Sequence, residues 1–254
     1  PTDIENKITK KTKAIIPVHL TVKILEMKKI NKIAKSKNIV VIEDAAQAIG
    51  SKYYNQMSGS IGHIGCFSTH PLKNLNASGD GGFITTNNAL YAKRIKKLCN
   101  LGIINRNIVE EFGYVSRLDN LQAAILLYRL SKIKDVIRKR RNNVDFYMKN
   151  LDKNHVFFPK EKKYQFNTYH TFVIQVRERE KLRNYLKKKG IGTAIHYPIP
   201  IHLQPAAKKL KYTKNSFPVT ERQSKEILTL PVHQFLSNKQ IKFITDTINE
   251  YFKQ

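Results

Sequence analysis

Apolar residues in the first part of the chain occur in short runs that alternate with one amphipathic stretch. Residues 13–20 and 39–42 are rich in Ile and Val, which is typical of buried strands. Between them, residues 24–37 carry apolar side chains at close to helical spacing, and Asn38 follows. A strand, a helix and a strand in this order form a βαβ unit, and such units build parallel sheets covered by helices. The pattern therefore predicts an α/β fold.

Glycine-rich stretches interrupt the pattern that follows. Residues 50–65 predict turns and a short hairpin, and residues 64–68 predict another strand. Residues 79–86 predict a tight turn that leads into a strand, because adjacent glycines allow backbone conformations closed to other residues. Residues 89–101 predict a basic amphipathic helix.

A long helical pattern over residues 119–148 contains neither Pro nor Gly, and a helix of this length commonly joins two domains. After Pro159 the pattern changes to that of a small α+β domain. Its expected elements are a strand at 169–176 and helices at 180–189, 221–228 and 238–251. We expect a large domain over residues 1–150, including the long helix, and a smaller C-terminal domain over residues 151–254.

The formal net charge of +27 raises the hypothesis of a nucleic-acid or polyanion partner. The lysines are scattered along the chain together with abundant Asn and Ile, and they are not interleaved with aromatic residues as in a nucleic-acid groove. A compositional bias is the simpler interpretation, so we expect no nucleic-acid partner. A basic surface would still attract a substrate that carries phosphate.

No apolar run approaches the length of a membrane span, and the first residues lack the apolar core of a signal peptide. We therefore expect a cytoplasmic protein without a membrane span. Cys66 and Cys99 have no CxxC spacing and no neighbouring His or Cys cluster, so we expect free, largely buried thiols and no metal site.

The candidate chemistry lies between residues 40 and 82, where an acidic residue ends an apolar run and a lysine stands in a loop. Asp44 follows a predicted parallel strand, and open α/β sheets bind their ligands at this end of their strands. The alternative that Asp44 only caps a following helix stays open. Lys73 stands between Pro71 and Asn74 in a loop, although most lysines only make a surface more polar.

Asp44, Lys73 and Ser68 together match the requirements of pyridoxal phosphate. Its aldehyde requires a lysine for a Schiff base, and its pyridinium nitrogen needs a carboxylate in order to stay protonated. Its phosphate needs hydroxyls and backbone amides.

Five blocks of the sequence, in matching order, resemble the DegT/DnrJ/StrS-type sugar aminotransferases. They read VIEDAAQAIG, GCFSTHPLKNLNASGDGGFITT, RLDNLQAAIL, HYPIPIHLQPA and FPVTERQSKEILTLPVHQFLS, and they extend over essentially the whole chain. The resemblance implies the large domain of the fold-type I pyridoxal phosphate enzymes, with a partial, mostly parallel sheet, plus the smaller C-terminal domain. It also implies a homodimer with the active site at the subunit interface.

The resemblance assigns roles to seven residues of this chain. Lys73 would form the internal aldimine with pyridoxal phosphate and then move the proton between the cofactor and the substrate carbon. Asp44 would pair with the pyridine nitrogen, Gln47 would lie against the ring, and Ser68 would bind the phosphate. His196 and Tyr197 match a segment that borders the substrate, although a loop histidine without a role is an equal alternative for His196. Arg117 is the seventh, as an anion contact.

By the same resemblance, the reaction would be amino transfer, with glutamate as the donor and a nucleotide-linked keto sugar as the acceptor, in glycan or polysaccharide biosynthesis. Relatives that remove the 3-hydroxyl of a keto sugar carry histidine at the lysine position, so Lys73 favours transamination.

Two departures from the family pattern stand out. Val115 occupies a position where the family has an asparagine that reaches the cofactor phosphate across the dimer, and valine cannot donate that hydrogen bond. The chain also opens where the family has already supplied a phosphate-binding turn, so we expect an N-terminally truncated sequence that is inactive or unstable alone. Val115 favours a non-catalytic regulatory or binding protein of the same fold as the alternative function.

Overall fold

The computed structural model describes residues 2–254, which divide into two compact units. Unit 1 extends to Arg138 and also contains Glu161–His170, whereas unit 2 contains Lys139–Lys160 and Thr171–Gln254. The boundary falls inside the long helix α4 (Asn120–Asn150). The division into functional domains at residue 150 stays a prediction.

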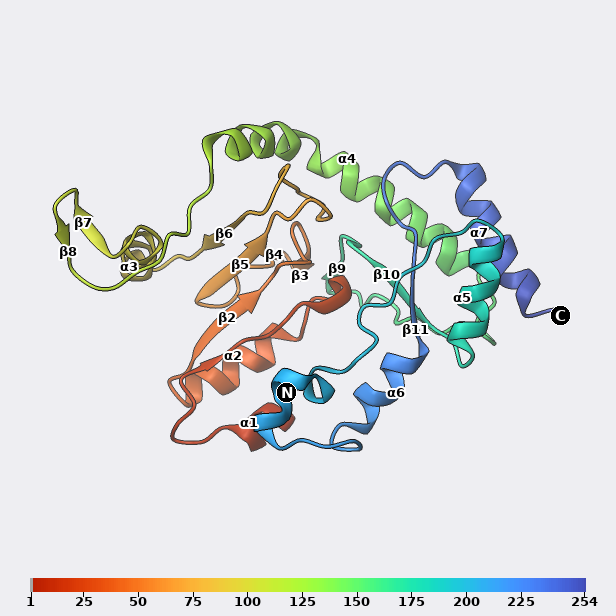
Figure 1. Ribbon diagram of the computed structural model, residues 1–254, viewed down its shortest axis with the longest axis horizontal. Helices are drawn as coiled ribbons and strands as arrows, with labels where there is room; N and C mark the ends of the chain where they lie inside the picture. Colours follow the sequence, from red (N-terminus) through yellow and green to blue (C-terminus); the bar gives the residue numbers. More distant parts are fainter. Residues whose placement is uncertain (1) are drawn as a thin grey trace. The chain divides into compact units, whose positions relative to one another are not determined.

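A four-stranded sheet forms the centre of unit 1. Its order is β1 (Ala14–Ile15), β2 (Val40–Asp44), β5 (Ile64–Ser68) and β6 (Gly82–Thr85), and β2, β5 and β6 lie side by side in Figure 1. The first three strands are parallel and β6 is antiparallel to β5. The predicted mostly parallel sheet is therefore confirmed.

Helix α2 (Met27–Ser36) covers this sheet because its apolar residues recur at helical spacing. Met27, Ile30 and Ala34 are buried, and they pack in one core with Val41 of β2. Burying side chains of this size removes enough apolar surface from water to hold the helix on the sheet.

Shorter elements complete unit 1. They are α1 (Thr2–Lys7), η1 (Leu20–Val22), β3 (Lys52–Tyr53), β4 (Gln56–Met57), α3 (Ala89–Cys99), β7 (Ile103–Asn105), β8 (Ile108–Val109) and β9 (Gln165–Phe166). Asn88 caps α3, since its side chain accepts hydrogen bonds from the amides of Leu90 and Tyr91.

Unit 2 is built on the antiparallel pair β10 (Phe172–Gln175) and β11 (Ile227–Leu230). Its other elements are α5 (Arg179–Lys188), η2 (Ile201–Leu203), η3 (Pro205–Leu210), α6 (Pro218–Glu226) and α7 (Asn238–Tyr251). Tyr147 lies fully buried in this unit, stacked on Phe172 with ring centroids 5.3 Å apart. The small α+β character of this region agrees with the sequence pattern.

Two predicted elements differ most from the structure. The strand expected over residues 13–20 extends only over Ala14–Ile15. Beyond it, the backbone around Val18 pairs with β2 only at Asp44, through one isolated bridge that is too short to count as a strand. The helix expected over residues 221–228 ends at Glu226, because the next residues are buried as strand β11 against β10. Tertiary pairing overrides helical spacing there.

Across residues 2–254, the structure contains no helix that is both long and apolar enough to cross a membrane. The same residues contain no group of three or more His, Cys, Asp or Glu side chains arranged to hold a metal ion.

Candidate functional site

Asp44 is the last residue of β2, at the carboxyl end of a parallel strand. Residues 45–50 form turns, so the alternative that Asp44 caps a helix is wrong. Its Oδ1 instead accepts a hydrogen bond of 3.1 Å from the Ala46 amide. This local contact turns the chain sharply after the strand. The carboxylate therefore lies at the carboxyl end of the parallel strands, where Asp44 is opposite Cys66 of β5.

Lys73 lies in the loop that follows β5, and its side chain is half-buried. Burial lowers the pKa of Lys73 below its ordinary value, while the charge of Asp44 acts in the opposite direction. Two residues 29 positions apart in sequence therefore interact electrostatically in the folded chain. Burial favours the neutral amine, which is the form that a nucleophilic lysine needs, and it outweighs the opposing charge of Asp44.

Helix α4 anchors the Lys73 loop through apolar contacts. Leu75 and Ala77 of the loop are buried against Leu126 of the helix. This part of the helix therefore has a specific task, because it packs under the loop that carries the lysine.

Polar side chains hold the same loop in place. Nη1 of Arg129 donates to the carbonyl oxygens of Asn76, at 2.7 Å, and Ala77, at 3.2 Å. Oε1 of Gln122 accepts a hydrogen bond of 2.7 Å from the Ser78 amide. The loop is irregular, and these contacts satisfy backbone groups that no regular element would satisfy.

Close packing accounts for the paired glycines after this loop. Neither Gly81 nor Gly82 has a positive φ, so the predicted need for unusual backbone conformations is wrong. A Cβ on Gly81 would lie 2.6 Å from Oγ1 of Thr69, and one on Gly82 would lie 2.5 Å from the carbonyl oxygen of Phe67. The glycines are required because the chain passes too close for any side chain.

Gln47 and Ser68 lie at the same end of the sheet, the carboxyl end of its parallel strands. Gln47 stands in the turn after β2, and its Oε1 accepts a hydrogen bond of 2.8 Å from the Thr21 amide. Its carboxamide NH₂ has no hydrogen-bond partner within residues 2–254, so it can donate to a ligand. Ser68 ends β5, and its Oγ accepts from the His70 amide at 3.3 Å.

Arg117 and Val115 lie in the segment between β8 and α4, and both are exposed. The backbone of Val115 pairs with Asn100 in an isolated bridge, while its side chain is 70% exposed. The proposed anion contact of Arg117 stays a prediction.

His196 and Tyr197 belong to unit 2. Nδ1 of His196 lies 2.9 Å from Oγ1 of Thr229 on β11, and the Tyr197 side chain is 57% exposed. A satisfied loop histidine and a substrate contact both agree with this geometry, so the role stays a prediction.

Sequence reasoning missed Glu43, His19, Gln122 and Arg129. Glu43 had a usable signal, because it is an acidic residue inside an apolar strand and a charge is rarely buried there without partners. Gln122 and Arg129 carried no such signal, since polar residues on a long helix are ordinary.

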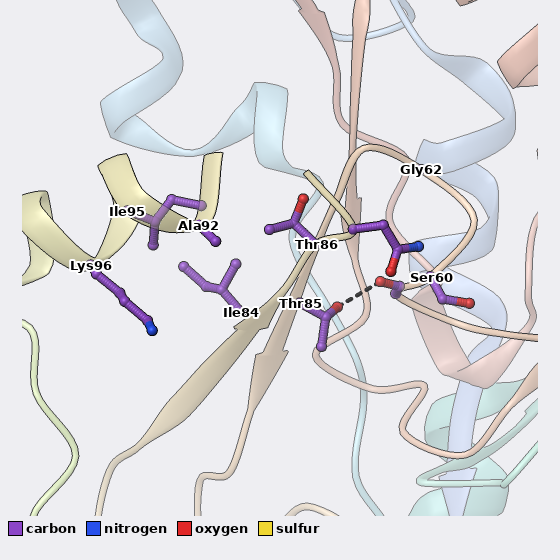
Figure 2. A pocket seen from close by; sticks show the side chains of 10 residues that line it. Ser60, Gly62, Ile84, Thr85, Thr86, Ala92, Ile95 and Lys96 are labelled. Carbon is purple, nitrogen blue, oxygen red and sulfur yellow. Dashed lines mark hydrogen bonds between the residues drawn. The ribbon is translucent and has the colours of Figure 1, made fainter. Parts of the chain in front are cut away.

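A hollow in unit 1 lies away from these residues. Ile84 of β6 and Ala92, Ile95 and Lys96 of α3 line it, together with glycine and threonine residues of the neighbouring turns (Figure 2). It contains none of the predicted cofactor residues. The chemistry of the side chains, and not the depth of this hollow, therefore identifies the candidate site.

We expect Arg129→Ala to destabilise the protein by about 1–3 kcal/mol, because two carbonyl oxygens in the Lys73 loop lose a charged donor. Urea unfolding measures this free energy. Arg138→Ala, which alters a guanidinium that is 62% exposed, serves as the control and should change stability far less. Equal effects of the two substitutions would contradict the anchoring role.

The lowered pKa of Lys73 predicts a pH effect on stability. The unfolded chain holds the Lys73 proton up to the ordinary pKa of 10.5, whereas the folded chain releases it at a lower pH. Stability should therefore rise with pH between these two values, and Lys73→Met should remove this rise. Urea unfolding of both proteins across this pH window gives the difference. A difference that stays constant or falls with pH would contradict the burial of the amine.

The donor set fits pyridoxal phosphate. It offers a half-buried amine, a carboxylate that acts on it electrostatically, a carboxamide with a free NH₂ group, and a serine hydroxyl at the end of β5.

Comparison with known proteins agrees with this chemistry. A sequence model of the DegT/DnrJ/EryC1/StrS aminotransferase family matches residues 1–249. The "dTDP-3-amino-3,6-dideoxy-alpha-D-galactopyranose transaminase" of Aneurinibacillus thermoaerophilus is 40% identical over 251 residues, which cover 99% of this chain and 69% of that protein. The "Pleiotropic regulatory protein" of Geobacillus stearothermophilus is 38% identical over 256 residues, covering 100% of this chain and 69% of that protein.

Among solved structures, S. venezuelae DesV in complex with a ketimine intermediate matches with a TM-score of 0.96 and 32% identity. The match covers 99% of this chain and 68% of that one. The predicted fold of a fold-type I pyridoxal phosphate enzyme is thereby confirmed.

Proposed function

The chain belongs to the DegT/DnrJ/EryC1/StrS aminotransferase family, and on this premise we propose that it transfers an amino group from glutamate to a nucleotide-linked keto sugar. Its cofactor is pyridoxal phosphate, which supplies a carbonyl for the amine and a ring that withdraws electrons. The observation that carries the proposal is a half-buried lysine amine in the loop after β5, close enough to the carboxylate at the end of β2 for the charge of Asp44 to act on its pKa.

Each residue has a distinct task in this proposal. The lowered pKa of Lys73 increases its neutral fraction near neutral pH, so its Nζ can attack a carbonyl and later accept or return a proton. Asp44 holds a proton on the ring nitrogen by its negative charge. Gln47 donates its free NH₂ to the ring, and Ser68 donates its hydroxyl to the phosphate.

Arg117, His196 and Tyr197 are proposed as contacts to anionic groups and to the substrate. Arg117 carries an exposed guanidinium suited to an anionic group of the cofactor or the nucleotide. His196 and Tyr197 offer an imidazole and a phenol for hydrogen bonds to sugar hydroxyls.

Amino transfer is tested in two halves. With L-glutamate alone, the full-length protein loaded with pyridoxal phosphate should release one 2-oxoglutarate per cofactor, measured by coupled dehydrogenase assay. Addition of keto sugars linked to dTDP should then regenerate the starting absorbance of the cofactor. Absence of 2-oxoglutarate from a protein that binds the cofactor would contradict the enzymatic proposal.

A regulatory or binding function is the second candidate, supported by the name of the Geobacillus stearothermophilus relative and by Val115. The same experiment separates the two functions. A non-catalytic protein would bind pyridoxal phosphate and leave glutamate unchanged.

Assembly as a homodimer is supported by large apolar side chains exposed in unit 1. On α4, Leu121 and Leu127 are each 71% exposed, and Phe112 before the helix is 99% exposed. Light scattering should give twice the chain mass of 29.4 kDa, and Leu127→Lys should shift the mass toward the monomer. A monomeric wild-type protein would contradict the assembly. The cytoplasmic location stays a prediction.

A further inference from the structure

Glu43 is a fully buried carboxylate one residue before Asp44. Successive residues of a strand point to opposite faces, so Glu43 points away from the face that carries the Asp44 side chain. Four donors meet its two oxygens. Oε2 accepts from Nε2 of His19 at 3.0 Å and from the Gly59 amide at 2.9 Å, and Oε1 accepts from the amides of Ile61 at 2.7 Å and Gly62 at 2.5 Å.

These contacts keep Glu43 ionised inside the unit. Burial by itself would raise the pKa of the Glu43 carboxyl, but the hydrogen bonds from His19 and the three amides outweigh it and lower the pKa. A buried charge is stable only while its donors stay in place. The carboxylate therefore constrains every segment that supplies one of them.

His19 links this carboxylate to the backbone of Asp44. The Leu25 amide lies 3.4 Å from Nδ1 of His19, which places the ring proton on Nε2, facing Glu43. The backbone amide of His19 donates to the carbonyl oxygen of Asp44 at 3.0 Å, and the Asp44 amide donates to the carbonyl oxygen of Pro17 at 3.0 Å. His19 thus bonds Glu43 through its ring and Asp44 through its backbone.

The segment after His19 also reaches Gln47. Thr21 adopts a φ of 51°, which is strained for a β-branched residue, and its amide donates to Oε1 of Gln47 at 2.8 Å. This contact fixes the carboxamide with its NH₂ group free. The short stretch from His19 to Thr21 therefore contacts both residues that are proposed to touch the cofactor ring.

A second restraint holds the turn that faces Glu43. Oγ1 of Thr85 on β6 donates to the carbonyl oxygen of Gly59 at 2.6 Å, which is the dashed line in Figure 2. Gly62 is also enclosed, because a Cβ there would lie 2.9 Å from the carbonyl oxygen of Val41. The turn that supplies three of the four donors to Glu43 is thus held to β6 by a hydrogen bond and packed closely against β2.

We propose that Glu43 and His19 are positioning residues that hold the backbone of Asp44 and the side chain of Gln47 in the geometry that the cofactor requires. The proposal rests on the proposed cofactor roles of Asp44 and Gln47. Glu43 acts through its four donors and touches neither the cofactor nor the substrate.

Glu43→Gln tests this proposal, because either orientation of the new amide places an NH₂ group against two N–H donors. Two readouts apply: hydrogen–deuterium exchange of residues 40–47 in the cofactor-free protein, and the Kd for pyridoxal phosphate from absorbance. We expect exchange at Asp44 to accelerate and Kd to rise, each about tenfold. Glu178→Gln, at a side chain 58% exposed, is the matched control and should change neither.

A second pair of variants keeps the test decisive if Glu43→Gln does not fold. His19→Ala removes one donor of four, and His19→Gln restores an N–H at a similar reach, so the first should raise Kd and the second should recover it. A folded Glu43→Gln or His19→Ala protein with a lower melting temperature but unchanged exchange and Kd would overturn the proposal. Failure of the wild-type protein to bind pyridoxal phosphate would refute the proposed function instead, while the exchange result would still decide the positioning role.

Discussion

Lys73→Ala should lower the rate of 2-oxoglutarate release from glutamate by about 10⁴-fold or more, because the variant loses both the nucleophile and the group that moves the proton. Loss of a group with two tasks lowers the rate more than loss of a single binding contact does. The rate is measured in single-turnover experiments on protein saturated with pyridoxal phosphate, so weaker cofactor binding does not confuse the result.

The matched control for this experiment is Lys32→Ala, which removes an exposed lysine from α2. Its rate should equal that of the wild-type protein. A Lys73→Ala protein that releases 2-oxoglutarate within about tenfold of the wild-type rate would show that another group performs the chemistry.

Asp44→Asn should reduce the same rate by about a hundredfold or more, because the ring nitrogen loses the negative charge that keeps it protonated. Asparagine retains an oxygen that can accept from the Ala46 amide, so the turn after β2 is preserved and the effect reports on charge. Asp3→Asn, at an exposed position of α1, is the control.

A second expected effect of Asp44→Asn, on the reactivity of Cys66, can be measured without substrate. Burial raises the pKa of the Cys66 thiol, and the charge of Asp44 raises it further. Removing that charge should lower the thiol pKa, so Cys66 should react with a disulfide reagent at a lower pH than in the wild-type protein. An unchanged pH profile of Cys66 together with an unchanged catalytic rate would contradict the placement of Asp44 at the site.

Local patterns in the sequence predicted most of the large elements. Apolar spacing located α2, β2 and α4 within a few residues, because each of these elements buries one face or one strand in a core. The end of α6 and strand β11 were missed because Ile227 and its neighbours pair with β10, a partner distant in sequence. Periodicity contains no information on such partners.

The sequence predicted the chemistry of the candidate site but not the contacts that hold the site in place. The order of Asp44, Ser68 and Lys73 identified the chemistry, but not the reason for the glycines or the support of the loop. Gly81 and Gly82 are explained by atoms that approach them in three dimensions, and Arg129 reaches the loop from a helix more than fifty residues later. Glu43 was visible as a charged residue in an apolar strand, and only its four donors reveal what it does.

The central claim is that Lys73 is the lysine that binds pyridoxal phosphate covalently. Borohydride reduction of the protein with the cofactor, followed by proteolysis and mass spectrometry, locates the modified lysine directly. We predict one stoichiometric phosphopyridoxyl adduct on the peptide that contains Lys73, and none in Lys73→Ala. A stoichiometric adduct on any other lysine, or the same yield of adduct in Lys73→Ala, would contradict the claim.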